Sequence, residues 1–430
     1  MYLFLLVITV VTLFFFIKKT SYIIYLKSFL LPTVCILFIL LLIIFPNTAV
    51  ESAKEGLDLW FKTVFPSLFP FLVASDILNK TGIIKSLGIL LEPIMRPLFN
   101  LPGCASFTLL MGLTCGAPVG AKLTSSLRKE KLLTKVESER LLAFTNNLGP
   151  LFITGAVAVG MFKMPSIGVL LLACHILASL TVGLLFRFYG KNPKYKKENH
   201  REKNHNKNFI RKFKTEFRKT LNDSISSPAK ILGDSIQNSL GTMLTVGGFI
   251  TLFSVIINIL IETGFISYIS NVIFTIFIST GINKEIITAL LSGFFEITTG
   301  THLASEANSS FIQQLISVSL IMGWAGISVH FQIYSMISKT DINMKPYLFG
   351  KLLQGIFAAI YTFIGVKFIN LYPSLSLPVF NFIHSSHTLS WHQYFVISLY
   401  NILISISIFI LMSFVILFFN LFKKRKILSN

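Results

Sequence analysis

Charged residues are scarce in this chain of 430 residues: they make up 13% of it, against 53% hydrophobic residues. Soluble globular domains average about 25% charged residues. This scarcity, together with a mean hydropathy of +0.72, excludes an ordinary soluble domain. It predicts an all-α polytopic membrane protein, because helices satisfy their own backbone hydrogen bonds within lipid.

Cysteine is also rare in the chain. Its 4 cysteines are Cys35, Cys104, Cys115 and Cys174, and no two of them have C-x-x-C spacing. The spacing therefore indicates neither a disulfide framework nor a zinc site. Catalytic motifs are missing as well, since there is no H-E-x-x-H, no G-x-S-x-G and no phosphate-binding loop. We expect no enzyme, no metal and no cofactor, and we leave open whether an ion is coupled to the activity.

Positive charge is the exception to this scarcity, and it is concentrated in one segment. Residues 187–219 contain 13 Lys and Arg against 3 Asp and Glu, so 10 of the net charge of +20 lies there. Under the positive-inside rule such a segment lies in the cytoplasm. We predict a basic cytoplasmic loop at residues 189–223 that attracts anionic membrane lipid, and we expect no nucleic acid partner.

Long apolar runs predict the membrane spans. Two N-terminal transmembrane helices are expected in residues 1–47, the first of them uncleaved because no basic residue precedes its apolar run. Residues 48–59 and 83–101 are too polar for lipid-facing spans and are predicted to lie at the membrane surface. The further predicted spans are residues 60–78, 138–162, 166–186, 238–262, 310–338, 352–370 and 393–420, the last inside a C-terminal part, residues 371–430, with an outer loop and a basic tail.

Basic clusters orient these spans. Residues 128–135 carry four Lys and Arg, and Lys339, Lys345 and Lys351 follow a later span. Together with the basic loop and the basic tail, these clusters fit one topology in which all of them face the cytoplasm.

Two apolar stretches are interrupted by Gly, Pro and small polar residues. They read Gly112-Leu-Thr-Cys-Gly-Ala-Pro-Val-Gly-Ala-Lys122 and Phe144-Thr-Asn-Asn-Leu-Gly-Pro150. Within a membrane such breaks are tolerated only where other protein or a watery cavity takes up the freed backbone groups. We therefore predict a re-entrant hairpin at residues 103–135 and a broken helix at residues 138–162, with a binding site at the breaks.

Short matches between the two halves of the chain predict an internal repeat. Thr81-Gly82 recurs as Thr263-Gly264, at an offset of 182 residues. Gly112 recurs as Gly293 and Gly149 as Gly326, at offsets of 181 and 177 residues. Repeat one is predicted at residues 48–188 and repeat two at residues 224–370, with a hairpin at 286–308 and a broken helix at 310–338. Because each repeat crosses the membrane three times, the second is expected to be inverted, and each should hold an interfacial helix, a re-entrant hairpin and a discontinuous helix.

Inverted repeats with discontinuous helices are typical of secondary transporters, whose substrate sits between the repeats near the midplane. A half-helix N-terminus there carries roughly half a positive charge and attracts anionic or polar ligands. The candidate substrate-binding residues are Thr114, Cys115, Gly116, Lys122, Thr145, Asn146 and Asn147 from repeat one, and Glu296, Thr298, Thr299, His330 and Gln332 from repeat two.

Each candidate also has a structural interpretation. Lys122 could bind a substrate or a counter-ion, or extend to the cytoplasmic surface. Glu296 could bind a substrate or pair with Lys122. The two asparagines could line the site or cap the broken helix, since Asn is a good cap. His330 could be a packed histidine, and Cys115 a small packing residue.

Three motifs carry a resemblance to a known family. They are Pro118-Val-Gly-Ala-Lys122, the run from Glu139 to Asn147, and the run from Pro150 to Met161. On these motifs residues 50–370 resemble the sporulation integral membrane protein YlbJ family, whose members carry a nucleoside-recognition or gate domain. One departure is that Cys115-Gly-Ala-Pro118 stands where the family pattern has Ser-Gly-Tyr-Pro.

The resemblance implies a protein of endospore-forming bacteria in the outer forespore membrane of the mother cell. It implies a secondary transporter or facilitator that moves a small organic anion, dipicolinic acid, toward the forespore. Glu296 fits a dianion poorly and sugar hydroxyls well, so a nucleoside or other small-solute transporter stays open. A non-transporting sporulation membrane scaffold stays open too, as do a homo-oligomer and sporulation membrane partners.

Overall fold

The computed structural model describes residues 20–81, 83–190, 228–278 and 281–371, and no strand occurs among them. Within these ranges, four helical stretches are long and apolar enough to cross a membrane, and a bent helix pair adds a fifth. The four stretches are Pro165–Phe186, Pro228–Glu262, Phe311–Ile337 and Met344–Phe368. The chain is therefore an all-helical, multi-pass integral membrane protein, as its composition predicts.

Four predicted spans match these stretches, and the span predicted at 310–338 agrees with Phe311–Ile337 to within one residue at each end. Helix α9 (Pro165–Phe186) coincides with the span predicted at 166–186. Helices α11 (Pro228–Glu262) and α17 (Met344–Leu371) begin about ten and eight residues before their predicted spans. The spans predicted at residues 2–17 and 393–420 and nearly all of the basic loop lie outside the described residues.

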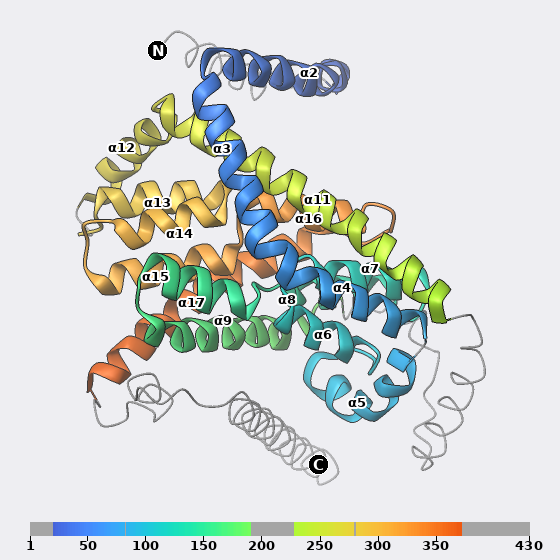
Figure 1. Ribbon diagram of the computed structural model, residues 1–430. Coiled ribbons are helices and arrows are strands. Elements are labelled where there is room, and N and C mark those ends of the chain that lie inside the picture. Colours follow the sequence, from blue (N-terminus) through green and yellow to red (C-terminus); the bar gives the residue numbers. More distant parts are fainter. Residues whose placement is uncertain (1–19, 82, 191–227, 279–280, 372–430) are drawn as a thin grey trace.

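The N-terminal part differs from the prediction at residues 48–59. Helix α2 (Thr20–Ile44) turns by 103° into helix α3 (Pro46–Leu59), which continues through a π-helical turn, η1 (Trp60–Val64), into α4 (Phe65–Lys80). Gly56 of α3 packs against the backbone of α11, where an added Cβ would lie 2.9 Å from Thr251 Cα. The helix predicted at 48–59 is therefore present but not separate, because α3 continues into α4. Small residues such as Ser52 and Gly56 give α3 a face that packs along α11 (Figure 1).

The elements of the two halves follow in the same order. In the first half α4 is followed by α5 (Ile83–Phe99), α6 (Ala105–Thr114), α7 (Val119–Lys129), α8 (Lys135–Thr145), η2 (Phe152–Met161) and α9. In the second half α11 is followed by α12 (Phe265–Phe277), α13 (Lys284–Phe295), α14 (Ile297–Glu306), α15 (Phe311–Trp324), α16 (Gly326–Ile337) and α17. Two of the Gly matches fall at equivalent joints. Gly112 and Gly293 each lie two residues before the end of α6 and α13, and Gly149 and Gly326 follow α8 and α15.

Hydrogen bonds locate the two ends of each helix pair, α6–α7 in the first half and α13–α14 in the second. The start of α6 is tied to α5, because Gly103 N–H donates to Glu92 Oε2. The end of α7 lies beside the loop that precedes α17, where Arg128 Nε donates to Asp341 Oδ1 at 2.8 Å. In the second half Asn308 N–H, just after α14, donates to Glu285 Oε2 at the start of α13, at 2.6 Å.

Helix α17 is the element that joins the two halves. It packs against α8 and α9 of the first half and α15 of the second, and Figure 1 shows α9, α15 and α17 side by side. The contacts are close because both sides supply small residues. At Gly350 of α17, an added Cβ would lie 2.6 Å from Ala143 O of α8. An added Cβ at Gly323 would lie 2.4 Å from Gly355 Cα. One helix thus carries side chains into the packing of both halves.

Candidate substrate-binding site

The first helix break, between α6 and α7, crosses the break between α8 and η2 at backbone contact. Ala117 N–H donates to Asn147 O at 2.6 Å. Glycines permit this approach, because an added Cβ on Gly112 or Gly120 would lie 1.8 or 2.3 Å from Thr145 O. We call this contact the first crossing.

The breaks of the second half also cross, between Glu296 and the Ala325-Gly326 joint; this is the second crossing. Gly326 has a φ of +79°, in the left-handed region that favours glycine, and its ideal Cβ position lies 3.1 Å from Phe295 O. Gly300 lies so close to Gly293 that an added Cβ would be 2.2 Å from its Cα. The predicted breaks of both halves are thus brought together in pairs.

The candidates at the α6–α7 break lie away from the polar interior. Thr114 is exposed, and its hydroxyl donates to Leu110 O in its own helix at 2.9 Å. Cys115 is 2% exposed and lies in an apolar cluster with Phe107 and Val119, which fits its interpretation as a packing residue. Gly116, at a φ of +92°, lies against the backbone of Gly149, so its role here is to allow the crossing.

The candidates Thr145, Asn146 and Asn147 lie at the first crossing and are fully buried. The Thr145 hydroxyl donates to Leu141 O at 2.8 Å. The side-chain amides of Asn146 and Asn147 donate to carbonyls near the end of α8, at 2.9 and 3.0 Å, so both asparagines cap that helix. Asn146 Oδ1, however, is buried with no hydrogen-bond partner among the described residues, which leaves one acceptor available at the crossing.

Lys122 lies one turn into α7, beside α4. Its Nζ is buried and has no hydrogen-bond partner within the described ranges, so the side chain does not extend to the surface. The charges near it are those of Asp76 and Lys80 of α4, which pair with each other at 3.1 Å. The suggested pair with Glu296 is wrong, because both carboxylate oxygens of Glu296 accept from other groups, at Thr298 and Thr299.

Glu296 is the N-cap of α14. It is 6% exposed, and its two oxygens accept from Thr298 N–H at 3.0 Å and Thr299 N–H at 2.7 Å. The negative charge therefore lies at the positive end of the half-helix, where it is stabilised. Thr298 and Thr299 contribute these backbone donors and are half-buried.

His330 and Gln332 lie on α16 and are 6% and 4% exposed. His330 Nδ1 is 3.0 Å from the Tyr347 hydroxyl of α17, and its ring meets the edge of Trp324 with ring centroids 4.3 Å apart. Its Nε2 is buried without a partner. His330 is therefore a packed histidine whose Nδ1 is hydrogen-bonded, and its Nε2 has no partner among the described residues and remains available to a ligand.

Lys351, which is not among the predicted site residues, lies on α17 beside the first crossing. The charge pattern predicts a cytoplasmic surface position for it, and that prediction is wrong: its exposed fraction is 0%. Lys351 Nζ donates to Asn146 O at 3.1 Å and to Gln354 Oε1 at 2.9 Å. No carboxylate among the described residues contacts it. A buried ammonium without an acid partner is costly and calls for an anion.

Gln354 and His175 extend this polar network. Gln354 Nε2 donates to Asn147 Oδ1 at 2.7 Å and lies 3.4 Å from His175 Nε2. That ring nitrogen accepts from Leu148 N–H, inside the α8–η2 break, at 3.3 Å. The network therefore links the freed backbone of the break to α9 and α17, which is the support that a broken membrane helix requires.

A signal for this network exists in the sequence. Tyr347, Lys351 and Gln354 are spaced four and three residues apart, so they share one face of a helix. The span predicted at residues 352–370 begins one residue after Lys351. Lys351 is therefore expected at the membrane surface and not in the buried interior.

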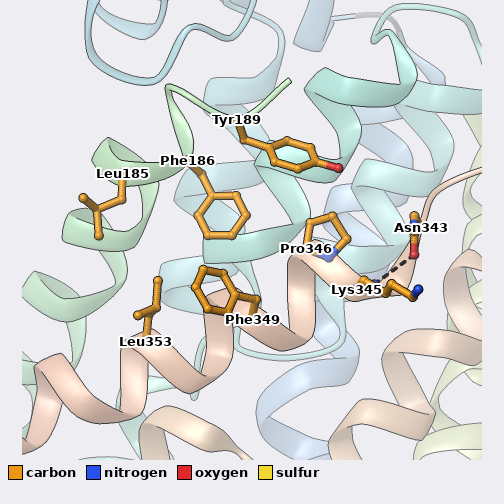
Figure 2. Close-up of a pocket in the computed structure, with 8 residues that line it drawn as sticks. All are labelled: Leu185, Phe186, Tyr189, Asn343, Lys345, Pro346, Phe349 and Leu353. Carbon is orange, nitrogen blue, oxygen red and sulfur yellow. Dashed lines mark hydrogen bonds between the residues drawn. The ribbon is translucent and has the colours of Figure 1, made fainter. Parts of the chain in front are cut away.

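A pocket of about 460 Å³ lies on the opposite face of α17 (Figure 2). Phe349 and Leu353 line it together with Phe186 of α9, and the rings of Phe186 and Phe349 have centroids 6.4 Å apart. Since Phe349 and Lys351 are about 200° apart around the helix, the pocket does not open onto the polar network.

Two charged residues of the run from Glu139 to Asn147 have structural roles. Glu139 accepts from the Tyr189 hydroxyl at 2.9 Å and from Asn343 N–H, just before α17, at 3.0 Å. Arg140 donates to Asn100 O at 3.0 Å and to Tyr189 O. These bonds fix the start of α17, and through it the position of Lys351. No group of His, Cys, Asp and Glu within the described ranges could hold a metal ion.

Comparisons with known proteins agree with this picture. Residues 61–181, which contain the first crossing, match the family described as "Gate: Nucleoside recognition". The chain is 42% identical over 330 residues to the sporulation integral membrane protein YlbJ of Bacillus subtilis (strain 168), covering 74% of this chain and 77% of that protein. No solved structure matches the chain.

Proposed function

The chain belongs to the YlbJ family of sporulation integral membrane proteins, and from that premise we propose that it is a secondary transporter or facilitator of a small organic anion. The proposed substrate is dipicolinic acid, and the proposed location is the outer forespore membrane of the mother cell. The proposal involves no catalytic step and no cofactor.

The observation that carries the anion proposal is Lys351 at the first crossing. Its side-chain nitrogen is wholly buried, with two neutral oxygen acceptors and no acid among the described residues. Inside a low-dielectric interior a positive charge attracts an anion far more strongly than in water. The crossing also holds backbone groups freed by two helix breaks, which is the usual surrounding of a transporter site.

The ends of the broken elements support an inverted arrangement of the two halves. The α6–α7 pair starts beside Glu92 and ends beside Asp341, at the end of the molecule where α17 begins. The α13–α14 pair starts and ends beside Phe311, which packs on Phe162 at the opposite end, with ring centroids 6.1 Å apart. Hairpins that enter from opposite sides suit alternating access to one central site.

Dipicolinate is a planar dianion with a ring nitrogen, so it needs a cation and donors in one plane. Lys351 supplies the cation in this proposal, and Lys122 lies further along α7 as a second positive group. Glu296 contacts neither lysine among the described residues, and its charge is stabilised by two backbone donors of α14 at the second crossing. Its proposed role is to hold the second crossing in shape.

A neutral nucleoside is the second candidate substrate. The observation in its favour is the pair of amides at the first crossing, Asn147 and Gln354, together with the unpartnered Asn146 Oδ1. Such groups pair well with hydroxyls and base edges. The match to the nucleoside-recognition family agrees with this candidate as well.

Uptake into vesicles that contain the purified protein tests both candidates. We expect labelled dipicolinate to enter, and excess unlabelled dipicolinate to suppress that entry. Uptake of labelled uridine tests the nucleoside candidate in the same assay, and protein-free vesicles serve as the blank. Uptake of uridine alone would replace the anion by a nucleoside, and uptake of neither by folded protein would favour a membrane scaffold.

A further inference from the structure

The hydrogen bonds of Lys351 fit a neutral amine better than an ammonium. Lys351 Nζ donates to two oxygens, Asn146 O at 3.1 Å and Gln354 Oε1 at 2.9 Å. A neutral amine has two N–H groups, which match these two acceptors, whereas an ammonium has three. The third N–H of a charged Lys351 therefore has no acceptor among the described residues until a ligand supplies one.

The two acceptors are fixed in orientation. Gln354 Nε2 donates to Asn147 Oδ1 at 2.7 Å, so its Oε1 is the atom turned toward Lys351. Asn147 Nδ2 in turn donates to Phe144 O at 3.0 Å, which sets the direction of the whole chain of bonds. Neither amide can turn to offer Lys351 another acceptor without losing a buried hydrogen bond.

We infer that Lys351 is neutral in the empty site and takes up a proton when the anion binds, so that anion and proton bind together. This inference rests on the proposed function. A carboxylate oxygen of the anion accepts the third N–H of Lys351, and its negative charge compensates the new positive charge. The anion thereby supplies both the acceptor and the counter-charge that the empty site lacks.

Other ionisable groups near Lys351 are less suited to take this proton. His175 of α9 uses Nε2 to accept from Leu148 N–H, so a proton on that nitrogen would break a bond of the α8–η2 joint. His330 of α16 packs on Trp324, with ring centroids 4.3 Å apart, and bonds to the Tyr347 hydroxyl, so its contacts lie toward the second crossing and not at the first. Tyr347, the remaining neighbour on α17, already bonds to His330.

The helices packed against α17 contribute no acid to this site. Helix α15 has no ionisable residue. The ionisable residues of α8 lie toward its start, and the first of them is Lys135. Of the other three, Glu137 binds Thr134 and Arg96, Glu139 binds Tyr189 and Asn343, and Arg140 binds Asn100 and Tyr189. On α9, the free thiol of Cys174 is the one ionisable neighbour of His175.

Calorimetry of dipicolinate binding in two buffers tests this inference. The purified protein is titrated at pH 7.5 in phosphate and in Tris, whose ionisation enthalpies differ, and the difference in heat gives the number of protons taken up. Carboxyl groups of the free ligand are ionised at this pH, so they release none. We expect about one proton per anion for the wild type.

Two variants place the proton. Lys351→Arg carries a permanent charge, and we expect it to bind dipicolinate with no proton uptake. Lys345→Arg, at an exposed position of the same helix, is the matched control and should keep the wild-type proton uptake. If Lys351→Arg does not fold, Lys351→Met is measured instead, and its affinity should fall at least about 100-fold.

The outcomes separate the inference from the proposed function. Binding by the wild type without proton uptake would overturn the inference and leave the anion transporter intact. Wild-type proton uptake in Lys351→Arg would also overturn it, because the proton would then go to another group. Wild-type affinity in Lys351→Met would remove Lys351 from the site. Absence of dipicolinate binding by folded wild-type protein would instead contradict the proposed function.

Discussion

The two crossings have the same backbone design and opposite side-chain chemistry. At the second crossing Glu296 satisfies the N–H groups of α14, and Trp324 Nε1 donates to Phe294 O at 3.1 Å. At the first crossing Asn146 Oδ1 has no partner and Lys351 has no acid among the described residues. At the second break the backbone donors are capped by its own Glu296, although Ser292 Oγ and His330 Nε2 have no partner among the described residues. The first break is completed by a helix from the opposite half.

This difference separates two roles of a helix break. A break whose groups are satisfied locally is a rigid joint, because opening it would cost buried hydrogen bonds. A break whose groups lack partners is ready to bind a solute, because a ligand can supply what is missing. We therefore assign solute binding to the first crossing and a joint to the second.

The largest expected effect is that of Lys351→Met. Removing the buried ammonium leaves the anion without its counter-charge, and we expect dipicolinate uptake into vesicles to fall at least about 100-fold. Lys345→Met, at an exposed position on α17, should keep uptake within a factor of two. Equal uptake by both variants would remove the assigned role of the first crossing.

Gly112→Ala should destabilise the protein strongly, because its Cβ would lie 1.8 Å from Thr145 O and force the breaks apart. We expect the free energy of unfolding to fall by about 3 kcal/mol, measured by thermal unfolding in detergent. The matched control is Gly241→Ala in α11, where no atom lies within 4 Å of the added Cβ. That change should raise stability slightly, since Ala favours helix.

Glu296→Gln tests the role of the second crossing. Glutamine keeps one side-chain acceptor for the start of α14 but loses the charge, so stability should fall by about 1 kcal/mol. Dipicolinate uptake should stay within about threefold, and the exposed Glu306→Gln should change neither quantity. Loss of uptake in a folded Glu296→Gln protein would return Glu296 to the substrate site and make the two crossings equivalent.

The smallest expected effect concerns the ion pair between the halves at the surface. Arg128, through a hydrogen bond, lowers the pKa of Asp341 from its usual value. The pair therefore contributes stability above about pH 4, the range of an unfolded aspartate, and loses it as Asp341 is protonated at lower pH. Asp341→Asn should lower the thermal midpoint slightly at pH 6 and match the wild type near pH 3. A constant difference across this range would assign the effect to packing.

The breaks could be predicted from the sequence because their signal is local. Gly, Pro and Asn interrupt apolar runs at Gly112–Lys122 and Phe144–Pro150, and continuous helices cannot form there within lipid. The pairing of the breaks could not be predicted, since it depends on backbone contacts such as that between Gly112 and Thr145. The repeat offsets suggested equivalent joints without showing which joints touch.

Lys351 could not be recognised from the sequence because its partners are distant in the chain. Asn146 lies 205 residues before it, and the lysine stands where a span was predicted to begin. A basic residue at such a position usually marks the cytoplasmic surface. Only the packing of α17 against the α8–η2 break turns it inward, and that packing depends on Gly350 lying against Ala143.

The most direct test is an experimental structure of the protein with dipicolinate bound. The account predicts a carboxylate oxygen at about 2.8 Å from Lys351 Nζ, within the first crossing and beside Asn146. Density for the anion beside Lys122 and α4, or at the second crossing beside Glu296, would contradict the assignment of solute binding to Lys351.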